Sequence, residues 1–164
     1  DTVAPARIDK SVKQRAEDLA VRCVKALDGV GIFGIEMFLT RDERVLVNEI
    51  APRPHNSGHY TIEACITSQF EQHLRAITGL PLGCPELMMP AVMVNLLGAE
   101  GHQGKPYFEG VDEILSIPGV SLHIYGKKET KPFRKMGHVT IVDKDEALEK
   151  AEIVKKTIKV VSEG

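Results

Sequence analysis

The chain has no tryptophan, and only 5% of its 164 residues are aromatic. It has no apolar run long enough to cross a membrane and no signal-like amino terminus, so we expect no membrane partner. An excess of positive charge is also missing, because 21 Lys and Arg residues stand against 23 Asp and Glu residues. A net charge of -2 with so few stacking side chains argues against a nucleic-acid partner.

Cysteine is scarce as well. Cys23, Cys65 and Cys84 are odd in number and widely spaced, which argues against a disulfide scaffold. Such a pattern is typical of reduced thiols, and we therefore expect a cytoplasmic protein.

The usual glycine-rich phosphate loops are missing. The chain has no GxxxxGK[ST] motif, and its one GxGxxG match, Gly29–Gly34, follows a predicted helix and leads into a predicted strand. A dinucleotide-binding loop needs the opposite order, so that the helix amino terminus faces the pyrophosphate. We interpret these glycines as a helix end and a closely packed strand.

What the chain does contain predicts an α+β fold in two parts, residues 1–84 and 85–164. Three prolines and a glycine between Leu80 and Pro90 indicate the boundary. Helical spacing of apolar residues predicts helices over 11–27, 61–77 and 111–115, and a closing helix that opens at Asp143. Strands are expected at 91–97, 120–125 and 137–142. The helix faces expected to be buried are Val12, Ala16, Leu19, Cys23 and Leu27, then Ile62, Ile66, Phe70 and Leu74, then Ala147, Ala151, Val154, Ile158 and Val161.

A hairpin over residues 31–50 carries one glutamate in each arm. If its turn centres on Asp42 and Glu43, Glu36 and Glu49 lie opposite each other on one face. Like charges in opposed positions repel, and a bridging Mg²⁺ would explain the arrangement because carboxylate oxygens suit this ion. Two half-buried glutamates paired with neighbouring cations are the alternative, and the hairpin alone does not decide between them.

The segment after the hairpin, Ala51–His59, reads APRPHNSGH. Proline, glycine and asparagine exclude a regular element there. A plain connector does not need Arg53, His55 and Asn56 together, so we favour a binding site on this loop. The spacing of His55 and His59 would suit zinc on a helix, but Pro54 and Gly58 disfavour a helix, and substrate contact is the preferred interpretation.

A basic segment over residues 127–138 reads KKETKPFRKMGH. By itself, such a charge run is more typical of a solvated hairpin tip than of a binding site. Nucleic acid is a weaker explanation, since only Tyr125 and Phe133 could stack on bases.

Four segments together resemble a known family: NEIAPRPHNSGHY at 48–60, SQFEQHLRAI at 68–77, APARI at 4–8, and residues 125–138. They are similar to carboxyaminoimidazole ribonucleotide synthases, which are ATP-grasp ligases of purine biosynthesis also known as the ATPase subunit of phosphoribosylaminoimidazole carboxylase. The resemblance implies that residues 1–84 are the carboxyl-terminal part of an ATP-grasp domain. Residues 85–164 would be a small mixed α/β domain with a phosphate-binding turn.

The resemblance also implies a reaction. ATP would phosphorylate bicarbonate to carboxyphosphate, and the carboxyl group would pass to the amine of aminoimidazole ribonucleotide. Glu36 and Glu49 would hold Mg²⁺ across the ATP phosphates, with Asn48 and Glu49 in contact with ATP. Arg53 would steady the bicarbonate or carboxyphosphate anion.

The same resemblance assigns the ribotide contacts. His55 and Asn56 would orient the substrate, with proton transfer by His55 as a further role. Lys127 and Arg134 would grip the ribotide phosphate. The segment around Lys127 is one residue longer than in some relatives, so Lys128 is an alternative to Lys127.

The family's amino-terminal nucleotide-binding half has no counterpart in these residues. Two functions therefore stay open: the catalytic half of a ligase, inactive by itself, or a non-catalytic ribotide-binding or assembly module. In the ligase we expect a homodimer.

Overall fold

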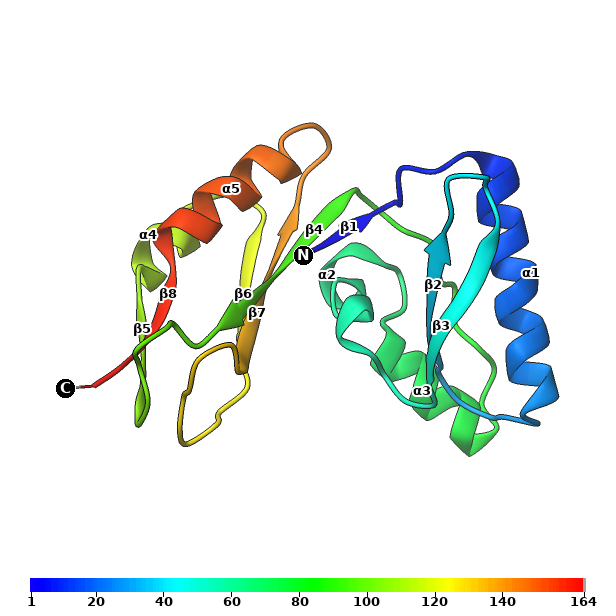
Figure 1. Ribbon diagram of the computed structural model, residues 1–164, viewed down its shortest axis with the longest axis horizontal. Coiled ribbons are helices and arrows are strands. Elements are labelled where there is room, and N and C mark those ends of the chain that lie inside the picture. The colour runs from blue at the N-terminus through cyan, green and yellow to red at the C-terminus, as the bar shows by residue number, and fades with distance from the viewer. Residues whose placement is uncertain (164) are drawn as a thin grey trace. The chain divides into compact units, whose positions relative to one another are not determined.

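The computed structural model describes residues 1–163, which form two compact units (Figure 1). One unit is Ala6–Leu87, and the other joins Asp1–Pro5 to the chain from Met88 onward. Helices and antiparallel strands occur in both, so the α+β prediction is confirmed. The sequence-based division after Cys84 stays a prediction about functional domains, and its last residue, Gly164, lies outside the described residues.

The Ala6–Leu87 unit is built around one β-hairpin. Its elements are α1 (Lys10–Ala26), β2 (Gly34–Leu39), β3 (Val45–Ala51), the 3-10 turn η1 (Asn56–Gly58), α2 (Thr61–Ala64) and α3 (Gln69–Thr78). Among the described residues 1–163, the hairpin strands pair only with each other, and α1 runs alongside them (Figure 1).

The helix predicted over 61–77 is wrong in its middle, where the chain breaks between α2 and α3. Cys65 leaves the helix to bridge Leu87, and the Ile66 amide donates to the carbonyl of Glu86 at 3.0 Å. The Ser68 hydroxyl then accepts the Glu71 amide at 3.2 Å and begins α3 as an N-cap. At its other end, α3 is closed by Gly79, which has a left-handed φ of 72°.

Most of the apolar stripes predicted to be buried in this unit are exposed. On α1, Val12 is buried and Ala16, Leu19 and Cys23 are half-buried, while Leu27, just after the helix, is 57% exposed. Ile66, in the break between α2 and α3, is 55% exposed, and Leu74 on α3 is 59% exposed. Ile62 and Phe70 are also exposed. Periodicity identifies a face that suits burial, but it does not show that the covering surface lies within the same 163 residues.

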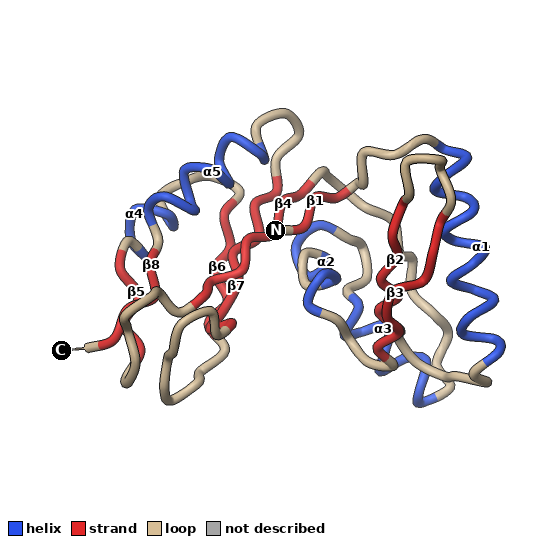
Figure 2. Tube along the Cα trace, viewed as in Figure 1, coloured by secondary structure: helices blue, strands red, loops and turns tan. Residues whose placement is uncertain are grey.

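The second unit is a four-stranded antiparallel sheet in the order β1-β4-β7-β6, with a separate two-stranded ladder of β5 and β8 (Figure 2). Its strands are β1 (Thr2–Ala4), β4 (Ala91–Leu97), β5 (Pro106–Glu109), β6 (Val120–Ile124), β7 (Lys135–Val142) and β8 (Lys159–Ser162). Its helices are α4 (Val111–Leu115) and α5 (Ala147–Thr157). None of the helices within residues 1–163 combines the length and apolar character needed to cross a bilayer.

The core of this unit lies between one sheet face and α5. Val92, Val94 and Leu96 alternate along β4 toward the helix, which buries Ala151 and Val154 against them. The predicted burial of Ala147 and Ile158 is confirmed as well. Val161 was wrongly assigned to this helix, because α5 ends at Thr157 and the chain continues as β8.

The turn before α5 is held by Asp143, which lies four residues before the helix and not at its first turn as predicted. One carboxylate oxygen accepts the amides of Asp145 and Glu146 at 2.9 and 2.8 Å, and the other pairs with Lys150 Nζ at 2.6 Å. The Lys150 ammonium, followed by the two amides, holds the pKa of Asp143 well below its ordinary value of 3.8.

This lowered pKa makes a prediction about stability and pH. The ion pair stabilises the fold above pH 4, where Asp143 is ionised in both states, and its contribution is lost as the pH falls toward the folded pKa. We expect D143N to melt below wild type at pH 7, and the two melting temperatures to converge in acid. The substitution keeps an oxygen for both amides and removes only the charge.

The control is E163Q, which breaks the exposed pair between Lys105 and Glu163 in the same unit. Exposed pairs contribute little, so its melting temperature should follow wild type at every pH. A D143N deficit that does not change with pH would contradict the assignment.

Candidate functional site

The hairpin places Glu36 and Glu49 directly opposite each other, as predicted, but by a different route. Leu39 pairs with Val45, so the turn centres on Asp42, half a residue away from the expected position. A β-bulge between Glu36 and Met37 adds one residue, Asn48, on the partner strand and restores the opposed register. The bulge therefore decides that the two carboxylates share one face.

Two neighbours hold the Glu36 carboxylate. Asn48 Nδ2 donates to one of its oxygens at 3.2 Å, and His55 Nε2 lies 3.5 Å from the other. The Glu36 side chain is 45% exposed and the His55 side chain 15% exposed. Glu49 is exposed. Both carboxylates are thus open to a ligand, and one is oriented.

This donor set fits Mg²⁺ better than a metal that needs a closed protein cage. Within residues 1–163 there is no group of three or more His, Cys, Asp or Glu side chains able to hold a metal. Mg²⁺ commonly takes one or two protein carboxylates and fills its other positions with water and phosphate oxygens. The paired glutamates Glu36 and Glu49 could supply the two carboxylates of such a site.

His55 packs closely against strand β2 of the hairpin. A Cβ on Gly34 would lie 2.5 Å from the Cβ of His55, so glycine at this position lets the loop approach β2. Ser57 Oγ lies 2.8 Å from His55 Nδ1 and orients the ring. The prediction that these glycines serve close packing is supported here, and Gly31 likewise lies against His73, whose Nδ1 accepts the Ile32 amide at 3.1 Å.

The remaining predicted loop residues lie close by in the sequence but differ in environment. Arg53 is exposed, and its Nη1 donates to the Pro54 carbonyl at 3.1 Å. Asn56 begins the turn η1 and is half-buried. Arg53 therefore offers a cation at the surface of the loop.

One residue of this unit that no sequence pattern singles out is Gln69. Its side chain is only 7% exposed, although glutamine at the start of a short helix is usually solvated. It bonds both the amide and the carbonyl of His55, each at 2.9 Å. Gln69 thus fixes the loop that carries the predicted site residues.

In the second unit, the predicted basic turn is fastened at its stem to two glycines. The Gly98 amide donates to the Arg134 carbonyl and the Phe133 amide donates to the Gly98 carbonyl, each at 2.9 Å. Thr130 exchanges two main-chain bonds with Gly104. A Cβ on Gly98 would overlap the Lys131 carbonyl oxygen, so a side chain there would displace the turn.

The side chains of Lys127 and Arg134, the two cations predicted to bind phosphate, each donate a hydrogen bond to a main-chain carbonyl. Lys127 Nζ donates to the Lys135 carbonyl at 2.6 Å and lies 5.9 Å from the centre of the Tyr125 ring. Arg134 Nη1 donates to the Glu129 carbonyl at 3.0 Å. Lys128 is exposed. The turn therefore presents Lys127 and Arg134 as half-buried, positioned cations.

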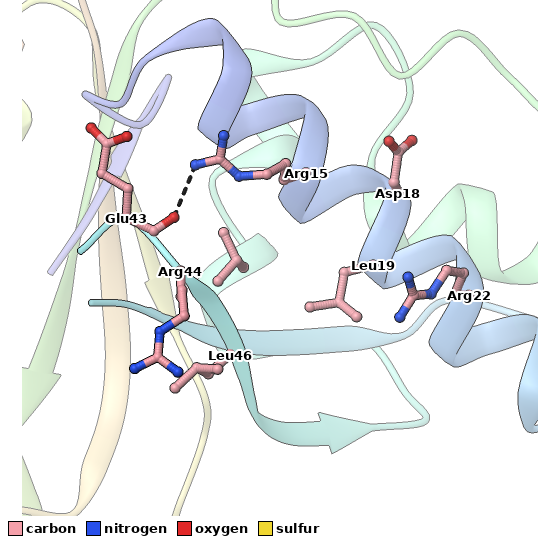
Figure 3. Close-up of a pocket in the computed structure, with 8 residues that line it drawn as sticks. Arg15, Asp18, Leu19, Arg22, Glu43, Arg44 and Leu46 are labelled. Atoms are coloured by element: carbon pink, nitrogen blue, oxygen red, sulfur yellow. Dashed lines mark hydrogen bonds between the residues drawn. The ribbon is translucent and has the colours of Figure 1, made fainter. Parts of the chain in front are cut away.

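A separate pocket of about 460 Å³ lies between α1 and the hairpin tip. Figure 3 shows Arg15, Arg22 and Arg44 around it, and Arg15 reaches the Glu43 carbonyl at 2.9 Å. Arg44 is already paired with Asp42 at 2.8 Å. None of the predicted site residues lines this pocket, so it is not the predicted site.

Comparison with family models divides the chain in two. Residues 1–70 match the ATP-grasp domain, and residues 91–152 match the phosphoribosylaminoimidazole carboxylase C-terminal domain. The hairpin and its loop fall in the first match, and the basic turn falls in the second.

Characterised relatives share about half of the aligned residues. The N5-carboxyaminoimidazole ribonucleotide synthase of Bacillus subtilis is 52% identical over 145 residues, which is 88% of this chain and 37% of that protein. The phosphoribosylaminoimidazole carboxylase of Schizosaccharomyces pombe is 53% identical over 146 residues, which is 85% of this chain and 26% of that protein. The chain thus spans between a quarter and two-fifths of the length of these two relatives.

Solved structures agree with the fold. The N5-carboxyaminoimidazole ribonucleotide synthetase of Thermotoga maritima superposes with a TM-score of 0.94 at 66% identity, covering 98% of this chain and 45% of that one. An Aspergillus clavatus N5-carboxyaminoimidazole synthase, solved with ADP and 5-aminoimidazole ribonucleotide, gives 0.81 at 41% identity, covering 93% and 43%. With both family models, the relatives and the solved structures in agreement, the chain belongs to the ATP-grasp family of N5-carboxyaminoimidazole ribonucleotide synthases.

Proposed function

We propose that this chain supplies the metal hairpin, the substrate loop and the ribotide-phosphate turn of a ligase. The ligase would use ATP and bicarbonate to carboxylate aminoimidazole ribonucleotide in purine biosynthesis. The observation that carries the proposal is the opposed pair Glu36 and Glu49, brought into register by a bulge in a chain that matches such ligases. Opposed like charges are unfavourable by themselves, and a shared cation would offset that cost.

In the Ala6–Leu87 unit, Glu36 and Glu49 would hold Mg²⁺, and Asn48 and Glu49 would contact ATP. The metal, when bound, supplies charge neutralisation for the transferred phosphoryl group. Asn48 orients the Glu36 carboxylate, because its Nδ2 donates to one oxygen while the other oxygen lies beside His55. These residues would do the binding and orienting.

Anion chemistry in the same unit falls to Arg53 and His55. The exposed Arg53 guanidinium would bind bicarbonate and then carboxyphosphate, whose charge a fixed cation stabilises. His55 and Asn56 would orient the ribotide, and His55 would be the group able to move a proton.

In the second unit, Lys127 and Arg134 would bind the ribotide phosphate. A planar guanidinium can hold two phosphate oxygens, and a second cation suits the dianion. We favour Lys127 over Lys128 because its ammonium is already held against the Lys135 carbonyl and the Tyr125 ring.

A cytoplasmic location is part of the proposal, and the free thiols of Cys23, Cys65 and Cys84 support it. A homodimer of the ligase is proposed from the family resemblance. The alternative function, a ribotide-binding module without ATP chemistry, is favoured by one observation: the basic turn is fastened entirely within its own unit.

The metal pair gives the first test of this function. In a full-length ligase that contains this chain, E49Q should lower ATP turnover on the order of 100-fold, the size typical of losing one preorganised electrostatic contact. E36Q should lower it to a similar or smaller extent. Steady-state ADP release measures both. E43Q, which removes a charge from the exposed tip of the same hairpin, is the control and should turn over like wild type.

The basic turn gives a second test, based on which substrate is affected. R134A should raise the ribotide KM by about 10- to 100-fold, which corresponds to a charge-assisted bond of about 1.5–3 kcal/mol. The ATP KM should stay near wild type. K127A should resemble R134A, and K128A should resemble wild type. Equal effects of R134A on both substrates would indicate a structural role instead.

Binding by the 164-residue chain alone tests whether it is only part of the catalytic unit. Each unit has its own helices and sheet, so we expect the chain to fold. Calorimetry should detect little affinity for Mg²⁺·ATP, because a hairpin alone offers few nucleotide contacts. Weak ribotide binding that R134A abolishes is expected with either function. Tight ATP binding or steady ADP release by this chain would refute the view that it is only part of the catalytic unit.

A further inference from the structure

The buried Gln69 side chain makes three hydrogen bonds to one short segment of the substrate loop. Its Oε1 accepts the His55 amide at 2.9 Å, and its Nε2 donates to the His55 carbonyl at 2.9 Å. The same Nε2 lies 2.8 Å from His59 Nδ1. A single amide thus reaches both ends of residues 55–59.

The orientation of this amide is decided by the main chain. A backbone N–H can only donate and a backbone carbonyl can only accept, so Oε1 must face the His55 amide and Nε2 its carbonyl. The second proton of Nε2 then points at His59 Nδ1, which must accept it. His59 is therefore held neutral, with its ring proton on Nε2.

The space around the amide is closed. A Cβ on Gly58 would lie 2.5 Å from Gln69 Oε1, so the loop main chain packs directly on the side chain. The main-chain N–H of Gln69 donates to Thr61 Oγ1 at 2.9 Å, and that hydroxyl donates to the Gly58 carbonyl at 2.6 Å. The His59 ring stacks on Phe70, the neighbour of Gln69 on α3, at 5.4 Å. Hydrogen bonds and packing therefore join the substrate loop to the first residues of α3.

We propose that Gln69 is the positioning residue of the substrate loop, fixing the main chain of His55 and holding His59 as a neutral ring that donates through Nε2. The proposal rests on the function proposed above, because it assigns Gln69 to the placement of His55 for the carboxylation. With His55 fixed by main-chain bonds, its ring stays beside Glu36 and within reach of Ser57. Gln69 acts through these residues.

The same helix offers a matched control. Gln72 makes the same two-bond contact with another residue: its Nε2 donates to the Gly83 carbonyl at 2.6 Å, and its Oε1 accepts the Gly83 amide at 2.8 Å. Gly83 lies outside the substrate loop. Any general cost of removing a backbone-binding glutamine from α3 should therefore appear in Q72M as well as in Q69M.

The first experiment reads the His59 ring directly, in the 164-residue chain and without substrates. In ¹⁵N-histidine NMR spectra of wild type, we expect Nδ1 of His59 to be unprotonated and Nε2 to carry the proton. In Q69E, the carboxylate keeps the bond to the His55 amide but cannot donate, so the proton should move to Nδ1 or both nitrogens should be protonated. Q72E should leave the wild-type spectrum unchanged.

A wild-type His59 that carries its proton on Nδ1 overturns the proposal, whatever the enzyme does. So does a Q69E spectrum identical to wild type. Because the wild-type tautomer is itself a readout, the wild-type half of this experiment does not depend on the folding of any variant.

The second experiment uses a full-length ligase that contains this chain. Q69M should lower the kcat for the formation of carboxylated ribotide by about 100-fold, the size expected when a reacting group is misplaced by about 1 Å. The ATP KM should stay close to wild type, and Q72M should resemble wild type in both. Equal losses in Q69M and Q72M would mean that Gln69 is only structural and would overturn the proposal. A wild-type ligase that forms no carboxylated ribotide would instead refute the proposed function, leaving the NMR result to decide the role of Gln69.

Discussion

Glu36 and Glu49, paired across neighbouring strands, put like charges on one face of the hairpin, and opposed like charges are unfavourable unless something offsets them. The bulge at Asn48 restores the register that opposes Glu36 to Glu49. The extra residue is itself used, because its amide donates to Glu36. Gly34 then allows His55 to close on the same carboxylate from the loop. The bulge at Asn48, the glycine at position 34 and the contact from His55 together fix the position of the Glu36 carboxylate.

In the second unit, the structure restrains the lysine and arginine side chains of the basic turn. Lysine and arginine on a hairpin tip normally lose too much side-chain entropy to stay in one place. Here the stem of the turn is bonded to Gly98 and Gly104, and both predicted phosphate cations donate to carbonyls of the turn itself. The core of α5 against the sheet supplies the rigid base on which this turn stands.

Local patterns in the sequence predicted the elements well and their surroundings poorly. The helix and strands around the apolar core were found because the helix repeats its apolar residues at helical spacing and the strands are short apolar runs. Glu36 and Glu49 were also found opposed. The opposed register, however, depended on a bulge that cancelled a half-residue error in the turn, and no hydrophobic pattern announces a bulge.

The break between α2 and α3 was missed for a related reason, since Ile66 bonds to Glu86, twenty residues away, and propensity is local. Gln69 was missed because burial of a glutamine depends on which main-chain groups need partners, and that is known only after folding. The roles of Arg53, His55, Asn56, Lys127 and Arg134 came from family resemblance and stay proposals.

The fastening of the basic turn bears on how such proteins tolerate changes in chain length. Tyr125, whose amide donates to the Met136 carbonyl at 2.9 Å, and Thr130, which pairs with Gly104, are two fixed points on either side of residues 126–129. An inserted or deleted residue between them can be absorbed by the arc of the loop without moving the main chain of Arg134, whose carbonyl accepts the Gly98 amide beyond the arc. Lys127 and the Glu129 carbonyl that accepts Arg134 Nη1 lie within this arc, so a change in loop length there would shift the proposed lysine contact while the main chain of Arg134 stays in place.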